Sequence, residues 1–183
     1  LTTRLTEQFG LRRPIVLAPM VAGTTSGHLA AAVSDAGGLG LFGGIHAGGA
    51  KWVREHINLV RARANARWGI GFITWMIPNF EANFQACLDE RVPIIAFSFG
   101  DPRHYMARAK AMGARVLCQV QTIETARMVL DAGADVLVAQ GNEAGGHTGR
   151  RGTLAFAAQV LDLPGHLPVL GAGGIRTRPA VPA

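Results

Sequence analysis

One pattern repeats along most of the sequence: a short apolar run that ends in small or polar residues, followed by a segment of helical character. The spacing of roughly 20 to 25 residues between successive runs predicts alternating strands and helices. Because the runs are apolar throughout, we expect parallel strands that are buried on both faces. The seven candidate strands are residues 15–18, 39–42, 69–73, 94–97, 116–120, 136–139 and 169–171.

The segments between these runs predict helices over residues 27–36, 50–63, 79–90, 103–112, 123–132 and 154–161. Polar residues suited to capping a helix N-terminus stand at three of them, namely Ser26, Asn79 and Thr122. Glycines that predict the ends of three helices follow at Gly37, Gly113 and Gly133.

Alternation of this kind fits two folds, an open doubly wound sheet and a (β/α)8 barrel. The first candidate strand ends in Pro19-Met20 rather than in the GxGxxG turn of a dinucleotide-binding sheet, so we favour the barrel. In a barrel the carboxyl ends of all strands meet at one mouth, where we expect a site. We therefore predict a single α/β domain over residues 1–183, a (β/α)8 TIM barrel with about seven strands.

The C-terminal end departs from this pattern. A closed barrel usually needs roughly 200 to 250 residues, whereas this chain has 183. Residues 176–183 contain two prolines and no apolar period, which predicts neither a helix nor a strand. We therefore expect a barrel that is truncated at its C-terminus.

Composition narrows the class of protein. The chain is 49% apolar and 16% charged, which is typical of a globular core and excludes global disorder. Every apolar stretch of about 18 residues is interrupted by charges or glycine clusters, and the first ten residues lack the apolar core of a signal peptide. Cys87 and Cys118 lie in separate apolar contexts without metal-ligand spacing. We therefore expect a cytoplasmic protein with reduced cysteines, no membrane partner and no metal.

The net charge of the chain raises the question of a polyanionic partner. The charge is +6, from 18 basic and 12 acidic residues. The arginines are scattered singly or in pairs, and no long basic run is interleaved with aromatic residues. A solvated surface explains this distribution better, so we expect no nucleic acid as a partner.

The most informative segment is AQGNEAGGHTG, which directly follows the candidate strand 136–139. Gly145, Gly146 and Gly149 would let the backbone approach a ligand, and His147 lies between them at the predicted mouth. A histidine there can exchange a proton near neutral pH. A glycine-rich turn with an incidental surface histidine explains the same spacing equally well.

A second glycine-rich segment, GAGGI at residues 171–175, follows the last candidate strand. Successive glycine amides at this position of a barrel can cradle a phosphate group, although close packing is the alternative. Gln119 and Gln140 end two apolar strands, where they could hydrogen-bond either a flavin ring or neighbouring loop backbone. Together the two glycine segments favour a phosphorylated cofactor across the mouth.

Four stretches resemble the nitronate monooxygenase family, once called the 2-nitropropane dioxygenases. They are PIVLAPMVAGTTSGHLAAAVSDAGGLGLFGG, VPIIAFSFGDP, AQGNEAGGHTG and PVLGAGGI. The resemblance extends from about Arg13 to Ile175, and AQGNEAGGHTG is its most specific part. The family implies an FMN-dependent (β/α)8 barrel.

The resemblance also implies a site. FMN would bind non-covalently, with its flavin ring at the barrel mouth and its phosphate at Gly173-Gly174, and His147 matches the family's active-site histidine. The residues implied in cofactor binding are Ala18, Pro19, Met20, Gln119, Gln140, Gly141, Gly145, Gly146, Gly173 and Gly174. One position departs from the family, because Gly71 stands where the third strand of many members has an asparagine that touches the flavin.

The implied reaction is the oxidation of alkyl nitronates, or of nitroalkanes, by O2 to carbonyl compounds and nitrite. Its partners would be the small-molecule nitronate and O2, and the resemblance leaves room for a homo-oligomer. Two alternatives stay open. FMN-dependent enoyl-acyl-carrier-protein reductases, which use NAD(P)H, have a similar EAGGH loop. The truncated chain could also be a non-catalytic fragment.

Overall fold

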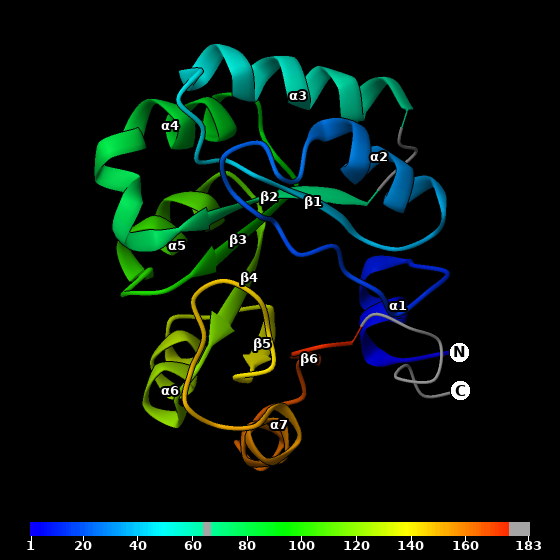
Figure 1. Cartoon of the computed structure of the whole chain (residues 1–183), viewed down its shortest axis with the longest axis vertical. Coiled ribbons are helices and arrows are strands. Elements are labelled where there is room, and N and C mark those ends of the chain that lie inside the picture. The colour runs from blue at the N-terminus through cyan, green and yellow to red at the C-terminus, as the bar shows by residue number, and fades with distance from the viewer. Residues whose placement is uncertain (64–66, 176–183) are drawn as a thin grey trace. The chain divides into compact units, whose positions relative to one another are not determined.

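The computed structural model describes residues 1–63 and 67–175 and has an α/β fold with parallel strands (Figure 1). Contacts between Cα atoms divide the chain into two compact units, Leu1–Val116 and Leu117–Ala183. The expectation of a single domain over the whole chain stays a prediction.

The first unit places three parallel strands under a layer of helices. Its elements are α1 (Arg4–Phe9), α2 (Gly27–Asp35), β1 (Gly40–Gly43), α3 (Gly49–Arg63), β2 (Trp68–Ile73), the 3-10 helix η1 (Thr74–Phe80), α4 (Glu81–Asp89), β3 (Ile94–Ser98) and α5 (Arg103–Ala111). β1 pairs with β2 and β2 pairs with β3, in chain order. Helix α3 packs against α2 on one side and α4 on the other (Figure 1).

Aromatic side chains fill the core of this unit. Phe42 of β1, Phe72 of β2, Phe84 of α4 and Phe97 of β3 are fully buried. The rings of Phe72 and Phe84 meet edge to face with centroids 5.4 Å apart, a favourable geometry for an aromatic pair. These contacts join the strands to the helix that covers them.

The second unit has three further parallel strands. Its elements are β4 (Arg115–Val120, whose first two residues fall in the first unit), α6 (Ile123–Asp131), β5 (Val136–Gln140), α7 (Thr153–Leu161) and β6 (Val169–Ala172). β5 pairs with β4 on one side and with β6 on the other, with Gln140 opposite Ala172. β5 is almost wholly buried, whereas β6 is mostly half-buried.

Six of the seven candidate strands are confirmed, each within one or two residues of its predicted ends. The remaining prediction, a strand over residues 15–18, is wrong: this segment makes a single parallel bridge, between Val16 and Leu39. Pro14 and Pro19 flank it, and a proline has no backbone N–H to extend a ladder of hydrogen bonds. The part of the chain that the structure describes therefore contains six strands rather than seven.

The predicted helices are confirmed, and their caps are confirmed in part. The Thr122 hydroxyl accepts a hydrogen bond from the backbone N–H of Thr125 at 3.1 Å and caps α6, whereas Ser26 holds the N-cap position of α2 without a side-chain bond. The Asn79 cap is wrong, because residues 74–80 form η1 and α4 begins at Glu81. Helix α1, which Thr3 starts with a capping box, was not among the predicted helices.

Each described helix is too short or too polar to cross a membrane. Cys87 and Cys118 are both buried, as expected, and burial raises the pKa of the Cys87 thiol. A buried thiol of this kind is inert and acts as a small apolar side chain.

Candidate functional site

The loop that follows β5, residues 141–149, is held to the strand by a buried amide. Gln140 is only 6% exposed. Its Nε2 donates a hydrogen bond to the carbonyl oxygen of His147 at 3.1 Å, and its Oε1 accepts one from Gln121 Nε2 at 2.8 Å. Gln140 thus folds the backbone of this segment, named here the His147 loop, over the end of β5.

The tip of the His147 loop is open. Gly145, Gly146 and His147 are exposed, and a Cβ added at Gly145 would meet no heavy atom within 4 Å. Gly146 has a φ of 78°, a backbone conformation that a side chain would strain. The backbone beside His147 is therefore accessible to a ligand.

The glycines of the two segments have different roles. A Cβ at either Gly141 or Gly173 would overlap the hydroxyl oxygen of Thr153, so these two glycines provide space for the start of α7. Gly174 is exposed and has a φ of 67°. Close packing therefore accounts for Gly141 and Gly173, whereas Gly174 offers exposed backbone to a phosphate or another acceptor.

The start of α7 brings in two residues, Glu143 and Thr153, that were not predicted as site residues. Glu143 Oε2 accepts hydrogen bonds from the Thr153 backbone N–H at 2.8 Å and from the Thr153 hydroxyl at 2.6 Å. The hydroxyl bond, followed by backbone N–H bonds from Glu143 and Thr153, lowers the pKa of the Glu143 carboxyl. The signal available in the sequence was a threonine at the start of an apolar helix, with an acid in the preceding glycine-rich loop.

Gln119 lies on β4, beside the strand that carries Gln140. It is opposite Val138, and because Val138 and Gln140 are two residues apart on β5, the two glutamines share one face of the strands. Gln119 is half-buried. Both predicted glutamines are therefore on the same side of the second unit.

Three predicted contacts, Ala18, Pro19 and Met20, belong to the first unit. Ala18 and Met20 are exposed, and the Met20 carbonyl oxygen accepts a hydrogen bond from the Thr25 hydroxyl at 2.9 Å. A Cβ at Gly71 would overlap the ring of Pro19. The proline thus fills the space in which the family's asparagine was expected.

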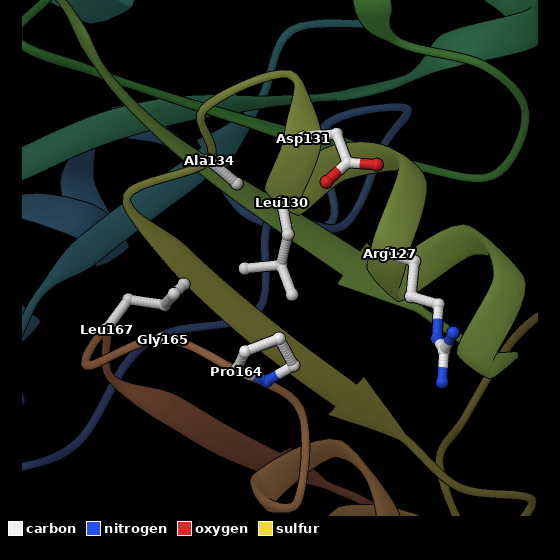
Figure 2. A pocket seen from close by; sticks show the side chains of 7 residues that line it. All are labelled: Arg127, Leu130, Asp131, Ala134, Pro164, Gly165 and Leu167. Carbon is white, nitrogen blue, oxygen red and sulfur yellow. The ribbon is translucent and has the colours of Figure 1, made fainter.

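An open cavity of about 640 Å³ lies elsewhere in the second unit (Figure 2). It adjoins the end of α6 and the segment before β6, near the amino ends of β5 and β6, whereas the His147 loop follows the carboxyl end of β5. Its lining residues are Arg127, Leu130, Asp131, Ala134, Pro164, Gly165 and Leu167. This cavity is separate from the candidate site.

The arrangement in the second unit can do two things chemically. Exposed glycine backbone can hydrogen-bond a ligand rich in acceptors, and the neighbouring imidazole can bind an anion or exchange a proton. The Glu143 carboxylate is already bonded within the chain. Within residues 1–63 and 67–175, no group of three or more His, Cys, Asp or Glu could hold a metal ion.

Comparison with known proteins bears on this site. The model of the nitronate monooxygenase family matches residues 49–183. The chain is 35% identical to the nitronate monooxygenase of Pseudomonas aeruginosa, in an alignment that covers 96% of this chain and 62% of that protein.

Two examples from the similar solved structures follow the same pattern of partial coverage. A FabK mutant from Thermotoga maritima matches with a TM-score of 0.88 and 32% identity, over 98% of this chain and 59% of that one. A nitroalkane oxidase from Streptomyces ansochromogenes matches with a TM-score of 0.76 and 31% identity, over 91% of this chain and 59% of that one. The chain spans about three fifths of the length of these three relatives.

Proposed function

The chain belongs to the nitronate monooxygenase family, and from this premise we propose that it takes part in the FMN-dependent oxidation of alkyl nitronates or nitroalkanes by O2. The products would be carbonyl compounds and nitrite. The observation that carries the proposal is the open tip of the His147 loop, where exposed glycine backbone adjoins an exposed histidine on a loop that Gln140 holds in place.

The residues present fit FMN in a specific way. Gly145, Gly146 and Gly174 are exposed, so their backbone amides would bind acceptor atoms of the cofactor. The family resemblance assigns contacts with the flavin ring to Gln119 and, separately, to residues 18–20. Gly141 and Gly173 would act through the packing of α7, and Gln140 through the loop that it holds. When bound, FMN would supply the redox chemistry that joins the nitronate to O2.

His147 would act on the substrate. A nitronate is an anion, and an imidazole N–H at the loop tip can hydrogen-bond its nitro oxygens. For a neutral nitroalkane, the same imidazole would take the proton from the carbon next to the nitro group. In either case the role of Gln140 is to hold the His147 backbone through its carbonyl oxygen.

The (β/α)8 barrel is part of the proposal. Its support is that β1 to β3 and β4 to β6 pair in parallel and in chain order, with helices between them. The proposal also includes a homo-oligomeric state, which size-exclusion chromatography tests.

The test is the variant His147→Ala. We expect the parent protein to bind FMN and to release nitrite from ethyl nitronate with uptake of O2. The variant should keep FMN and lose turnover by roughly 100-fold or more, the size expected for a lost acid–base group. His166→Ala is the matched control, because His166 is an exposed histidine in the segment between α7 and β6. Unchanged turnover in His147→Ala would contradict the role of His147.

The likeness to FabK favours a second candidate, an FMN-dependent enoyl-acyl-carrier-protein reductase that uses NAD(P)H. In that case His147 would donate a proton to the substrate. Bleaching of the flavin by NADPH under anaerobic conditions, without O2 uptake on nitronate, would favour the reductase. A colourless protein that self-associates would instead indicate the non-catalytic fragment.

A further inference from the structure

The N-terminus of α7 is capped by a carboxylate from a residue well before the helix in the sequence. α7 begins at Thr153, and its N-cap residue, Gly152, has no side chain with which to cap. Glu143, ten residues earlier, takes that role by accepting both the backbone N–H and the hydroxyl of Thr153, at 2.8 Å and 2.6 Å. A negative charge is favoured at this end of a helix, and hydrogen bonds to an ionised acceptor are stronger than neutral ones.

The same threonine touches the ends of two strands. Thr153 is 6% exposed, and its hydroxyl oxygen lies so close to Gly141 and Gly173 that a Cβ at either would overlap it. Gly141 also donates its backbone N–H to the carbonyl oxygen of Ala172 at 2.9 Å. Thr153 is therefore packed between the segment after β5 and the segment after β6.

The His147 loop is thus attached at both ends. Near its start, the Asn142 N–H donates to the carbonyl oxygen of Arg151 at 2.8 Å, and the Glu143 side chain reaches α7. Near its end, Gln140 holds the carbonyl oxygen of His147 at 3.1 Å. Between these points lie Gly145 and Gly146, whose backbone is exposed. The position of the tip depends on its two attachments.

We propose that Glu143 and Thr153 are positioning residues, a clamp that fixes the His147 loop against α7 and the end of β6 and so sets the place of His147. This rests on the proposed function, because it takes His147 as the group that meets the substrate. The clamp has a second effect. It places a carboxylate of the chain itself at the N-terminal end of α7, where it occupies the Thr153 N–H that an anionic group of a ligand could otherwise use.

The first test uses the FMN-free full chain and needs no activity. Hydrogen exchange is measured for peptides that cover residues 141–152 in the parent protein and in four variants. Glu143→Ala and Thr153→Val should exchange about ten-fold faster or more, as expected when hydrogen bonds to a charged acceptor are lost. Thr153→Ser keeps the hydroxyl and should stay near the parent rate, and Glu143→Gln should lie between.

A matched control separates the clamp from general loss of stability. Thr3→Ala removes a cap of the same residue type from α1, in the first unit, and should leave exchange of residues 141–152 unchanged. Parent-like exchange in both Glu143→Ala and Thr153→Val would overturn the clamp. Exchange in Thr153→Ser as fast as in Thr153→Val would also overturn it, because the hydroxyl would then not matter.

The second test separates the clamp from the proposed function. In FMN-loaded protein, Glu143→Ala should lower kcat for ethyl nitronate about ten-fold or more, as for a displaced reacting group, and should change KM much less. Failure of the parent protein to oxidise nitronate would refute the proposed function, while the exchange data would still decide whether the clamp exists. Full turnover in Glu143→Ala with a loosened loop would refute the positioning of His147 alone.

Discussion

His56 connects two helices of the first unit through one ring nitrogen. Its Nδ1 accepts a hydrogen bond from the backbone N–H of Gly27, the first residue of α2, at 2.9 Å. A nitrogen that accepts is unprotonated, so this bond belongs to the neutral imidazole. Burial first, then the charges of His28 and His46, lower the pKa of His56, while Glu55 opposes them. The folded state therefore favours the neutral form.

A pH dependence of stability follows from this residue. The unfolded histidine binds a proton near pH ~6.5, whereas folded His56 binds it only at lower pH. Its contribution to the free energy of unfolding is therefore complete above the unfolded pKa and is lost as the pH falls through the folded value. His56→Asn keeps an acceptor but does not titrate, so urea denaturation should show a smaller loss between about pH 7.5 and 5.5. An equal loss in both proteins would contradict this role.

At the residue scale, the sequence predicts which residues form the candidate site, but it does not indicate which of them pack against α7 and which are exposed. AQGNEAGGHTG located His147 and its glycines. Gly173 and Gly174 are identical neighbours in the sequence, yet one packs against Thr153 and the other exposes left-handed backbone. Only the placement of α7 separates them, and that placement depends on contacts between residues distant in the chain.

At the level of elements, the start of α7 packs against the backbone at the ends of two strands. A double substitution at this contact tests the packing. Gly173→Ala should lower the free energy of unfolding by about 1–3 kcal/mol, because its Cβ overlaps the Thr153 hydroxyl oxygen. Adding Thr153→Ala removes that oxygen, so the double variant should lose less than the sum of the single losses. Urea denaturation of the parent, of Gly173→Ala, of Thr153→Ala and of the double variant gives the coupling.

Gly145→Ala is the control for this cycle, since nothing lies within 4 Å of its added Cβ. It should change the free energy of unfolding by less than about 0.5 kcal/mol. Strictly additive losses in the double variant would show that Gly173 is not required for the space of Thr153.

The elements themselves were largely predictable, because buried parallel strands are apolar throughout and the intervening helices end at glycines. Gly37, Gly113 and Gly133 all have φ between 82° and 94°, as a helix stop requires. The failures have local causes. Prolines limit residues 15–18 to one bridge. The 3-10 helix η1, which contains Pro78, occupies the position where the helix predicted over residues 79–90 was expected to start.

On the scale of the whole molecule, the two units should unfold separately. In the second unit β6, the last strand within the described residues, is mostly half-buried, and helix α7 exposes Leu154 to 87% and Leu161 to 63%. It is also the shorter unit, so it gains less from burial of apolar surface. We expect it to unfold at the lower urea concentration.

The tryptophans make this measurable. Trp52, Trp68 and Trp75 are the chain's three tryptophans, and all lie in the first unit. Circular dichroism in the far ultraviolet reports both units, so part of its change should precede the shift in tryptophan fluorescence. Peptide-resolved hydrogen exchange should assign the early step to residues after 116. Coincident transitions would mean that the chain unfolds as one cooperative body.

Pro19 and Gly71 belong to segments about fifty residues apart in the chain, yet they share one volume, since a Cβ on the glycine would overlap the proline ring. The two positions therefore cannot change independently. A mutational path that installs a side chain at 71 must first replace the proline at 19 or shift its backbone. Steric overlap thus sets the order of the two substitutions. An asparagine introduced at position 71 alone would be a dead end, whereas the same change would be tolerated once Pro19 has been replaced.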